Sequence, residues 1–353
     1  MINYREAHSI KEFDREQWDA MAGNVVAMTY GWQCVMETGW QNKTPCYLWI
    51  EDERGPLAAI ITQLNEDFGS HGALGWFHSH LNAVISPPFS GIGTGVLLRP
   101  GESFEIMRPH LDRILREFSR RHRRPLTTIA NVTDETRALW ESMSFHPSPR
   151  PDLMVMKVPD TYDAYLAGLN SKDRSELRRI RRHAQESGLE ITFERGPLAG
   201  EGEAIYPLFC EVYAKHGTSR ESMPFSPQFF HLLEQETPGQ AFLIKGYING
   251  VLEGVSLCLR HNDSLWWPMA GLHYEVARPH YLYFLLIDEM VQWSIENGIR
   301  FIDGGLTNER QKARHGFVRQ PRWYCYRSNV LAVNRFIAWA LPLARRLVKD
   351  DGL

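Results

Sequence analysis

A short stretch near the C-terminal end brings together cationic and acidic side chains that could take part in chemistry. An apolar segment ends at Asp303, and the polar run 308–317 follows a pair of glycines. A reaction at a carbonyl group needs close positioning, a donor for the developing oxyanion and a route for one proton. The cations of the run suit the oxyanion, and the acids suit the proton or, as we prefer, an ion pair that fixes the loop. The catalytic candidates are Asp303, Glu309, Lys312 and Arg314, with Gly304, Gly305 and Phe317 beside the substrate.

Two elements should hold these residues in place. Apolar residues recur at helical spacing over 281–297, and Gly298 provides a C-terminal stop. The segment 299–303 alternates like a short buried strand and ends at the glycine pair, where the chain can turn sharply. Ligands bind at strand ends in open α/β sheets. The pattern therefore predicts a ligand site beside Asp303.

Three motifs resemble the Fem-like branch of the GNAT acyltransferase superfamily. Members have a helix ending W-A-x-E-x-G, a strand ending in Asp-Gly, and a loop close to F-K-x-G-F. The counterparts here are 293–298 (Trp-Ser-Ile-Glu-Asn-Gly), 301–305 (Phe-Ile-Asp-Gly-Gly) and 313–317 (Ala-Arg-His-Gly-Phe). The loop departs from the pattern in two places, because Ala313 replaces the aromatic residue and Arg314 stands at the usual lysine. The resemblance covers roughly residues 160–330, and the first half only in architecture.

This resemblance implies an N-acyltransferase that forms an amide between an activated acyl donor and an amine acceptor in an interdomain cleft. The implied donor is an aminoacyl-tRNA, the implied acceptor is a cell-wall precursor or a small-molecule amine, and no cofactor is implied. One alternative uses acyl-CoA or an acyl-carrier protein as the donor. A second alternative is a non-catalytic protein of the same fold that binds a ligand or RNA.

The turn that holds the CoA pyrophosphate in GNAT enzymes lacks its glycine pair in this chain. The corresponding segments are 98–104 and 277–282, and bulky His280 and Tyr281 would block close approach of a phosphate to the backbone. Arg278 could still meet a phosphate through its side chain. CoA should therefore bind weakly. The glycine-rich segment 91–95 is interpreted as a turn.

A basic helix over 171–187 is the main candidate for contact with a polyanion. Arg174, Arg178 and either Arg181 or Arg182 lie three or four residues apart and share a face. The stripe either binds the phosphates of tRNA or of a diphosphate-bearing acceptor, or is a solvated face.

The substrate side of the cleft has further candidates around a second helix. Lys215 and His216 end the helix 204–215, where they either line the acceptor side or act as a cationic C-cap, and Tyr274 is a further substrate-binding candidate. His78 and His80 are interpreted as loop residues and not as metal ligands, because no third ligand has a suitable spacing.

Composition limits the remaining possibilities. The chain has 353 residues and a formal net charge of −3, so any polyanion must meet a local basic patch. The five cysteines are scattered, which favours reduced thiols over disulfides or a metal site. The N-terminus lacks the apolar run of a signal peptide, and the longest apolar segment, 336–344, is too short to span a bilayer. We expect a cytoplasmic protein.

The order of elements predicts an α/β (α+β) fold of two tandem GNAT-like domains, each with a mixed central sheet flanked by helices. Three prolines in 145–151 disfavour regular structure, and we expect the strand 153–158 to complete the first sheet just after them. The predicted units are 1–158, 159–330 and a C-terminal helix, 331–353, that packs back on the core. Packing of its apolar face is preferred over a partner or membrane-surface role.

Overall fold

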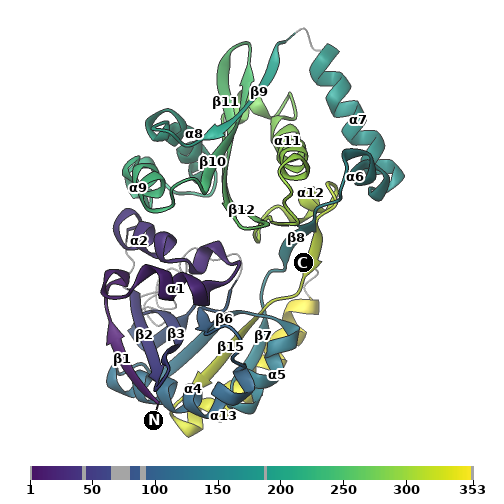
Figure 1. The fold of residues 1–353 in the computed structure, drawn as a ribbon. Helices are drawn as coiled ribbons and strands as arrows, with labels where there is room; N and C mark the ends of the chain where they lie inside the picture. Colours follow the sequence, from purple (N-terminus) through teal and green to yellow (C-terminus); the bar gives the residue numbers. More distant parts are fainter. Residues whose placement is uncertain (1, 42–44, 65–79, 88–92, 187–188, 351–353) are drawn as a thin grey trace.

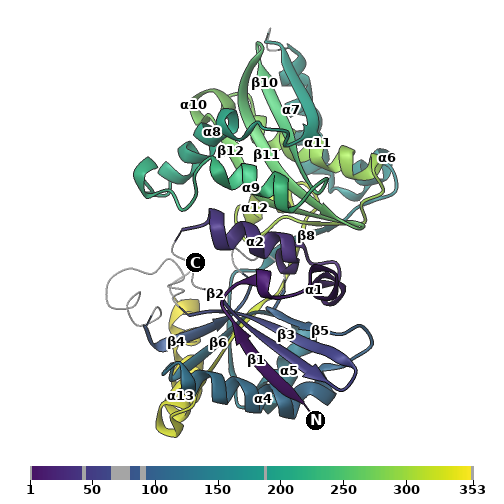
Figure 2. The ribbon, with the colours of Figure 1, turned by 60° about the vertical axis from the view of Figure 1, so that its left-hand side comes forward.

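The computed structural model describes residues 2–41, 45–64, 80–87, 93–186 and 189–350. These residues form two lobes, each built on a mixed sheet, with α2 (Tyr30–Gly39) lying where the lobes meet (Figures 1 and 2). The predicted fold class is confirmed. Among the helices that the structure describes, none combines the length and apolar character needed to cross a bilayer.

The first sheet alternates its side chains between two apolar layers. In β2 (Pro45–Asp52), Leu48 and Ile50 pack with α4 (Phe104–Arg121) and α5 (Asp134–Ser142). Tyr47 and Trp49 point the other way, onto α1 (Arg15–Ala22). The strand order is β1-β2-β3-β4-β6-β15-β7, with β5 paired to β3. The other strands are β1 (Asn3–Ala7), β3 (Gly55–Gln63), β4 (Asn82–Ile85), β5 (Val96–Leu98), β6 (Leu126–Val132), β7 (His146–Pro149) and β15 (Trp323–Ser328).

The second sheet has α11 (Leu282–Glu296) on one face and α8 (Gly202–Ala214) with α9 (Gln228–Glu236) on the other (Figure 1). Its order is β14-β8-β13-β12-β11-β10-β9. Helix α2 packs on α9, so buried apolar residues of the first lobe join the core of the second. The strands are β8 (Leu153–Lys157), β9 (Ile191–Pro197), β10 (Ala241–Ile248), β11 (Val251–His261), β12 (Ser264–Leu272), β13 (Phe301–Asp303) and β14 (Val318–Gln320).

The two lobes exchange strands, which the sequence did not predict. Strand β8 pairs with β13 and β14 in the second sheet, whereas β15 from the C-terminal part lies between β6 and β7 in the first (Figure 1). The expectation that 153–158 completes the first sheet is therefore wrong. A strand's own pattern sets which faces are buried, but its partners lie about 150 residues away in sequence, at 301–303 and 318–320. The division into units at residue 158 stays a prediction.

Two further expectations need correction. The proline-rich segment contains β7, which is tolerated because β7 is at the edge of its sheet. The C-terminal helix, α13 (Leu331–Asp350), packs against β15 and β7 with Ile337 half-buried. Phe336 and Trp339, expected to be covered, remain 60% and 64% exposed because they lie on the opposite side of the helix.

Candidate active site

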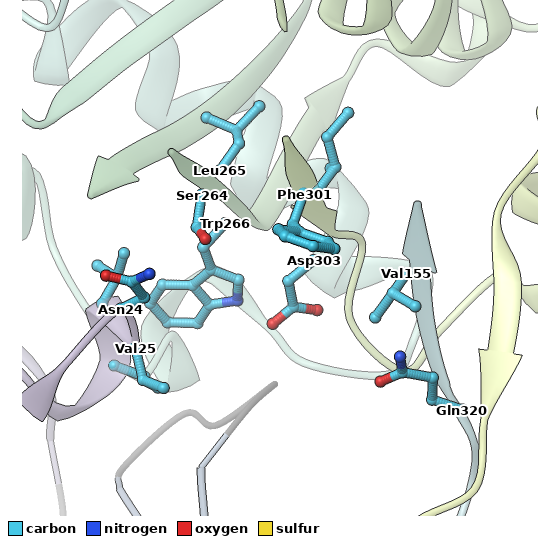
Figure 3. Close-up of a pocket in the computed structure, with 12 residues that line it drawn as sticks. Asn24, Val25, Val155, Ser264, Leu265, Trp266, Phe301, Asp303 and Gln320 are labelled. Carbon is cyan, nitrogen blue, oxygen red and sulfur yellow. The ribbon is translucent and has the colours of Figure 1, made fainter. Parts of the chain in front are cut away.

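A cavity of about 230 Å³ lies between the lobes and is the setting for the candidate site. Residues 24–27, between α1 and α2, form one wall. The first strand residues of β12 and all of β13 form the opposite wall, with Val155 and Gln320 at the side (Figure 3). Most of this lining is apolar, and the carboxyl group of Asp303 is the one acidic group among the described lining residues.

Strand register brings Asp303 into the cavity wall. Trp266 of β12 is the parallel partner of Asp303, which in turn is the antiparallel partner of Val155 in β8. Residues in register on neighbouring strands share a face of the sheet. The three side chains therefore form one row that faces the first lobe (Figure 3).

The carboxyl group of Asp303 is buried but only half satisfied. The residue is 3% exposed, and its Oδ1 accepts a 2.8 Å hydrogen bond from the backbone N–H of Gly305. Oδ2 has no hydrogen-bond partner among the residues that the structure describes. Burial raises the pKa of Asp303 to about 7, against the smaller opposing effects of the Gly305 N–H, Lys312 and Arg322. A carboxyl group with a pKa near neutrality can both take and return a proton.

Lys312 holds the turn that follows Asp303. It belongs to α12 (Glu309–Ala313), is 4% exposed, and donates from Nζ to the carbonyl oxygen of Gly304. The ammonium also lies 5.1 Å from the centre of the Trp267 ring. Burial lowers the pKa of Lys312 to about 8. Lys312 does not line the cavity, so in this conformation it supports the backbone of the site and does not reach into it.

The rest of the predicted catalytic loop is turned away from the cavity. Arg314 makes ion pairs with Asp173 at 3.2 Å and Glu176 at 3.6 Å, on α7 (Ser171–Glu186). Glu309 pairs with Arg319 at 3.2 Å. The sequence predicts that Arg314 stabilises a developing oxyanion. In this conformation its guanidinium is instead paired with the two acids of α7 and does not line the cavity.

Phe317 and the glycine pair form the packed end of the turn. Phe317 is 3% exposed, and a Cβ added at Gly304 would lie 2.8 Å from its ring. Gly305 has φ +74°, a left-handed conformation that favours glycine. The two glycines therefore allow the close contact and the sharp turn that the sequence analysis expected of them.

The segment expected to exclude CoA covers the N-terminus of α11. Tyr281 is the N-cap residue with φ +57°, and Arg179 of α7 lies 4.9 Å over its ring. His280 stacks on His183 of α7 at 6.2 Å. Arg278 is exposed nearby. Aromatic side chains thus occupy the place where backbone N–H groups would otherwise meet a pyrophosphate.

Helix α7 uses part of its predicted cationic stripe inside the protein. Arg174 donates to the carbonyl oxygens of Leu166 and Ala167 at the end of α6 (Tyr162–Gly168). Arg181 forms a salt bridge with buried Asp288. Arg178 and Arg182 are exposed and lie one turn apart. The outward stripe is therefore made by Arg178 and Arg182.

The remaining predicted residues lie apart from the cavity. Lys215 follows α8, with its Nζ 4.0 Å from the centre of the Tyr274 ring, and His216 is exposed beside it. Tyr274 opens α10 (Tyr274–Ala277). His80 is exposed, whereas His78 and residues 91–92 of the glycine-rich segment lie outside the described residues.

One group of side chains elsewhere has the composition of a metal site. Glu6, Cys46 and His122 bring one ligand atom each within 4.8 Å of one another. Glu6 is already engaged by His122 at 2.7 Å and by Arg121, and a cation beside the group opposes metal binding. This group lies on β1, β2 and the end of α4, outside the cavity lining.

Sequence reasoning found Asp303 but missed most of its surroundings. Strand register brings Trp266 and Val155 to the cavity. Contact between the lobes brings residues 24–27 to it. No local pattern marks them. Gln320 and Arg322 follow the motif loop directly, so their nearness to Asp303 could have been suspected from the sequence.

Comparison with known proteins places the chain in a family. The model of the FemAB-like family, described by its role in peptidoglycan biosynthesis and recognition, matches residues 9–351, and the chain belongs to this family. It is accordingly an enzyme of the acyl- or aminoacyl-transferase class. No curated protein matches the sequence significantly.

Solved structures share the fold at low sequence identity. FemX has a TM-score of 0.59 at 10% identity, covering 95% of this chain and 100% of its own. The C-terminal domain of a putative lysylphosphatidylglycerol synthetase from Agrobacterium fabrum has 0.58 at 13%, covering 94% and 97%. A tandem GNAT protein from the clavulanic acid biosynthesis pathway has 0.55 at 14%, covering 93% and 98%. These likenesses concern the fold.

Proposed function

We propose that the protein forms an amide between an amine acceptor and the acyl group of an aminoacyl-tRNA, with Asp303 as the general base in the interlobe cavity. The observation that carries this proposal is the unpartnered Oδ2 of a buried carboxylate in the cavity wall. An unpaired polar atom in an apolar wall is costly unless a ligand completes it. The amine of the acceptor is such a ligand.

The reaction requires one proton transfer and no covalent enzyme intermediate. The amine nitrogen attacks the ester carbonyl carbon, which forms the C–N bond and a tetrahedral oxyanion. Asp303 accepts the proton that the nitrogen loses. When the oxyanion collapses, the bond to the tRNA ribose oxygen breaks, and the protonated Asp303 returns a proton to that leaving oxygen. A pKa of about 7 for Asp303 suits both transfers at neutral pH.

Two features support a tRNA ester over a CoA thioester as the donor. His280 and Tyr281, covered by α7, leave no open backbone cradle for a pyrophosphate at the start of α11. Arg178 and Arg182 offer an outward pair of cations at the spacing of one helical turn, which suits a phosphate backbone. This pair, in place of the predicted Arg174 and Arg178, is the proposed tRNA contact.

The test offers each possible acyl donor separately and detects the amide bond that is formed. The protein is incubated with charged total tRNA, acyl-CoA or acyl-carrier protein, each with a pool of amines that includes cell-wall precursors, and new amides are identified by mass spectrometry. We expect product from charged tRNA alone, and its loss in Asp303→Asn but not in the exposed control Asp160→Asn. Product only with acyl-CoA, or full activity of Asp303→Asn, would refute the proposal.

A further inference from the structure

Polar side chains recur along one row of paired residues on a face of the first-lobe sheet, with apolar Val84 between them. The pairings Gln63 with Val84, Val84 with Thr128, Thr128 with Tyr326, and Tyr326 with His146 run continuously over β3, β4, β6, β15 and β7. Residues in register share a face. A sheet face inside a lobe is normally apolar, so this row of polar groups needs an explanation.

Several polar atoms on this face are buried without a partner. Within the described part of the chain, both amide atoms of Gln63, which is 0% exposed, lack a hydrogen bond, and so does Nε2 of His146. Each such atom costs free energy when it is removed from water and left unpaired. This face of the sheet therefore carries polar groups whose hydrogen-bonding capacity the described residues do not use.

Two arginines continue the same face toward the second lobe. The backbone N–H of Arg150 donates to the carbonyl oxygen of Arg322 at 3.1 Å, one step beyond the pair Pro149 and Trp323. Arg150 therefore lies directly opposite Arg322, and their side chains leave the sheet on one side. Arg150 also lies 4.9 Å over the ring of Tyr324 on that side.

Neither guanidinium forms a hydrogen bond with a carboxylate among the described residues, although Asp303, Glu135, Asp134 and Asp152 act on Arg322 at longer range. Nε and Nη1 of Arg150 and Nε of Arg322 are buried and unpaired, and Arg322 is 7% exposed. Arg322 donates instead to the carbonyl oxygen of Pro321 at 3.0 Å and to Oε1 of Gln320 at 2.9 Å. Like charges directly opposite each other destabilise a strand pair, and buried charges need compensation.

Gln320 connects this pair to the candidate site. The side chain of Gln320 lines the interlobe cavity (Figure 3), and its Oε1 accepts the 2.9 Å hydrogen bond from Arg322. Burial has the largest effect on the pKa of Asp303 and of Arg322, but the two groups also interact electrostatically: the charge of Arg322 lowers the pKa of Asp303, and the charge of Asp303 raises the pKa of Arg322. An anion held by the two arginines would lie close to the reacting amine.

We infer that Arg150 and Arg322 bind an oxyanion, a phosphate or carboxylate group, of the amine acceptor. This inference rests on the proposed function and narrows it to acceptors that carry an anion near the amine. Guanidinium groups match both kinds of oxyanion in geometry and form charge-assisted hydrogen bonds with them.

The test measures anion binding without turnover. The Tm of the full chain is followed in sodium phosphate, sodium acetate and sodium chloride at equal ionic strength. A ligand that binds the folded state raises Tm progressively with its concentration above Kd. We expect such a rise in phosphate or acetate over chloride, and the more effective anion identifies which oxyanion the site prefers.

Variants locate the site. Arg150→Met and Arg322→Met should each abolish the rise, whereas Arg319→Met, at an exposed arginine paired with Glu309, should retain it. Arg322→Met also breaks two hydrogen bonds, so if it fails to fold, Arg150→Met decides the question. No rise in the wild type, or a rise that survives in Arg150→Met, would overturn the inference.

The proposed function and this inference can fail separately. Asp303→Asn should keep the anion-dependent rise in Tm while losing turnover. A protein that binds phosphate or acetate through these arginines but forms no amide would refute the proposed function alone. Amide formation without any anion effect would refute the inference alone.

Discussion

Replacing Asp303 with asparagine should change activity and stability in opposite directions. Asparagine has the same shape, and its amide oxygen can still accept the hydrogen bond from Gly305, but it cannot take a proton. Loss of a general base typically lowers the rate by about 10²- to 10⁴-fold. The pH dependence should disappear too: the wild-type kcat/KM should rise with pH through the pKa of Asp303, about 7, whereas residual activity of the variant should not.

The stability effect follows from proton linkage. Burial raises the pKa of Asp303 from its ordinary value of 3.8 to about 7, so between these pH values the folded protein holds a proton that the unfolded chain has released. Stability from this group is present below pH 3.8 and is lost as pH rises to about 7. The gap of about three between the pKa values corresponds to roughly 4 kcal/mol.

Denaturant unfolding of both proteins at pH 5 and pH 8 tests this reasoning. The variant should gain stability relative to the wild type between the two pH values, by up to the greater part of those roughly 4 kcal/mol. It should be the more stable protein at pH 8. An equal pH dependence for the two proteins would show that Asp303 is not a buried acid of raised pKa. Unchanged turnover would show that it is not the base.

Other substitutions test the parts around the site. Because burial lowers the pKa of Lys312 from 10.5 to about 8, the wild type should gain stability as pH rises between these values, and Lys312→Met should lack that gain in denaturant unfolding. Changing both Arg178 and Arg182 to Ala should lower the salt slope of tRNA binding by up to about 2, at about 0.9 for each phosphate that is no longer neutralised; an unchanged slope assigns them to a solvated face. Phe317→Ala should cost about 3–5 kcal/mol of unfolding free energy, because the ring is buried against Gly304, and a loss under about 1 kcal/mol would contradict that packing. Trp339→Ser should change thermal stability by no more than about 0.5 kcal/mol, because the indole is exposed; a larger loss would mean that it is covered.

Local pattern predicted the elements well and their assembly poorly. Helices 171–187 and 281–297 agree closely with α7 and α11, because burial periodicity and end signals act within a few residues. The sequence could point to Asp303 as a candidate because a strand that ends at two glycines is a local pattern. The ion pairs of Arg314 could not be predicted from the sequence, because Asp173 and Glu176 lie more than 130 residues away and no local pattern shows whether a cation is paired.

The exchange of β8 and β15 has a consequence for how the chain can be divided. Residues 1–158 alone would lack the strand between β6 and β7, and residues 159–353 alone would lack the neighbour of β13 that also holds β14. Each fragment would expose unpaired strand edges and lose part of its core. The two lobes should therefore melt as a single cooperative unit, and neither should fold when it is expressed without the other. Genetic dissection of this enzyme then calls for point substitutions and not for truncation.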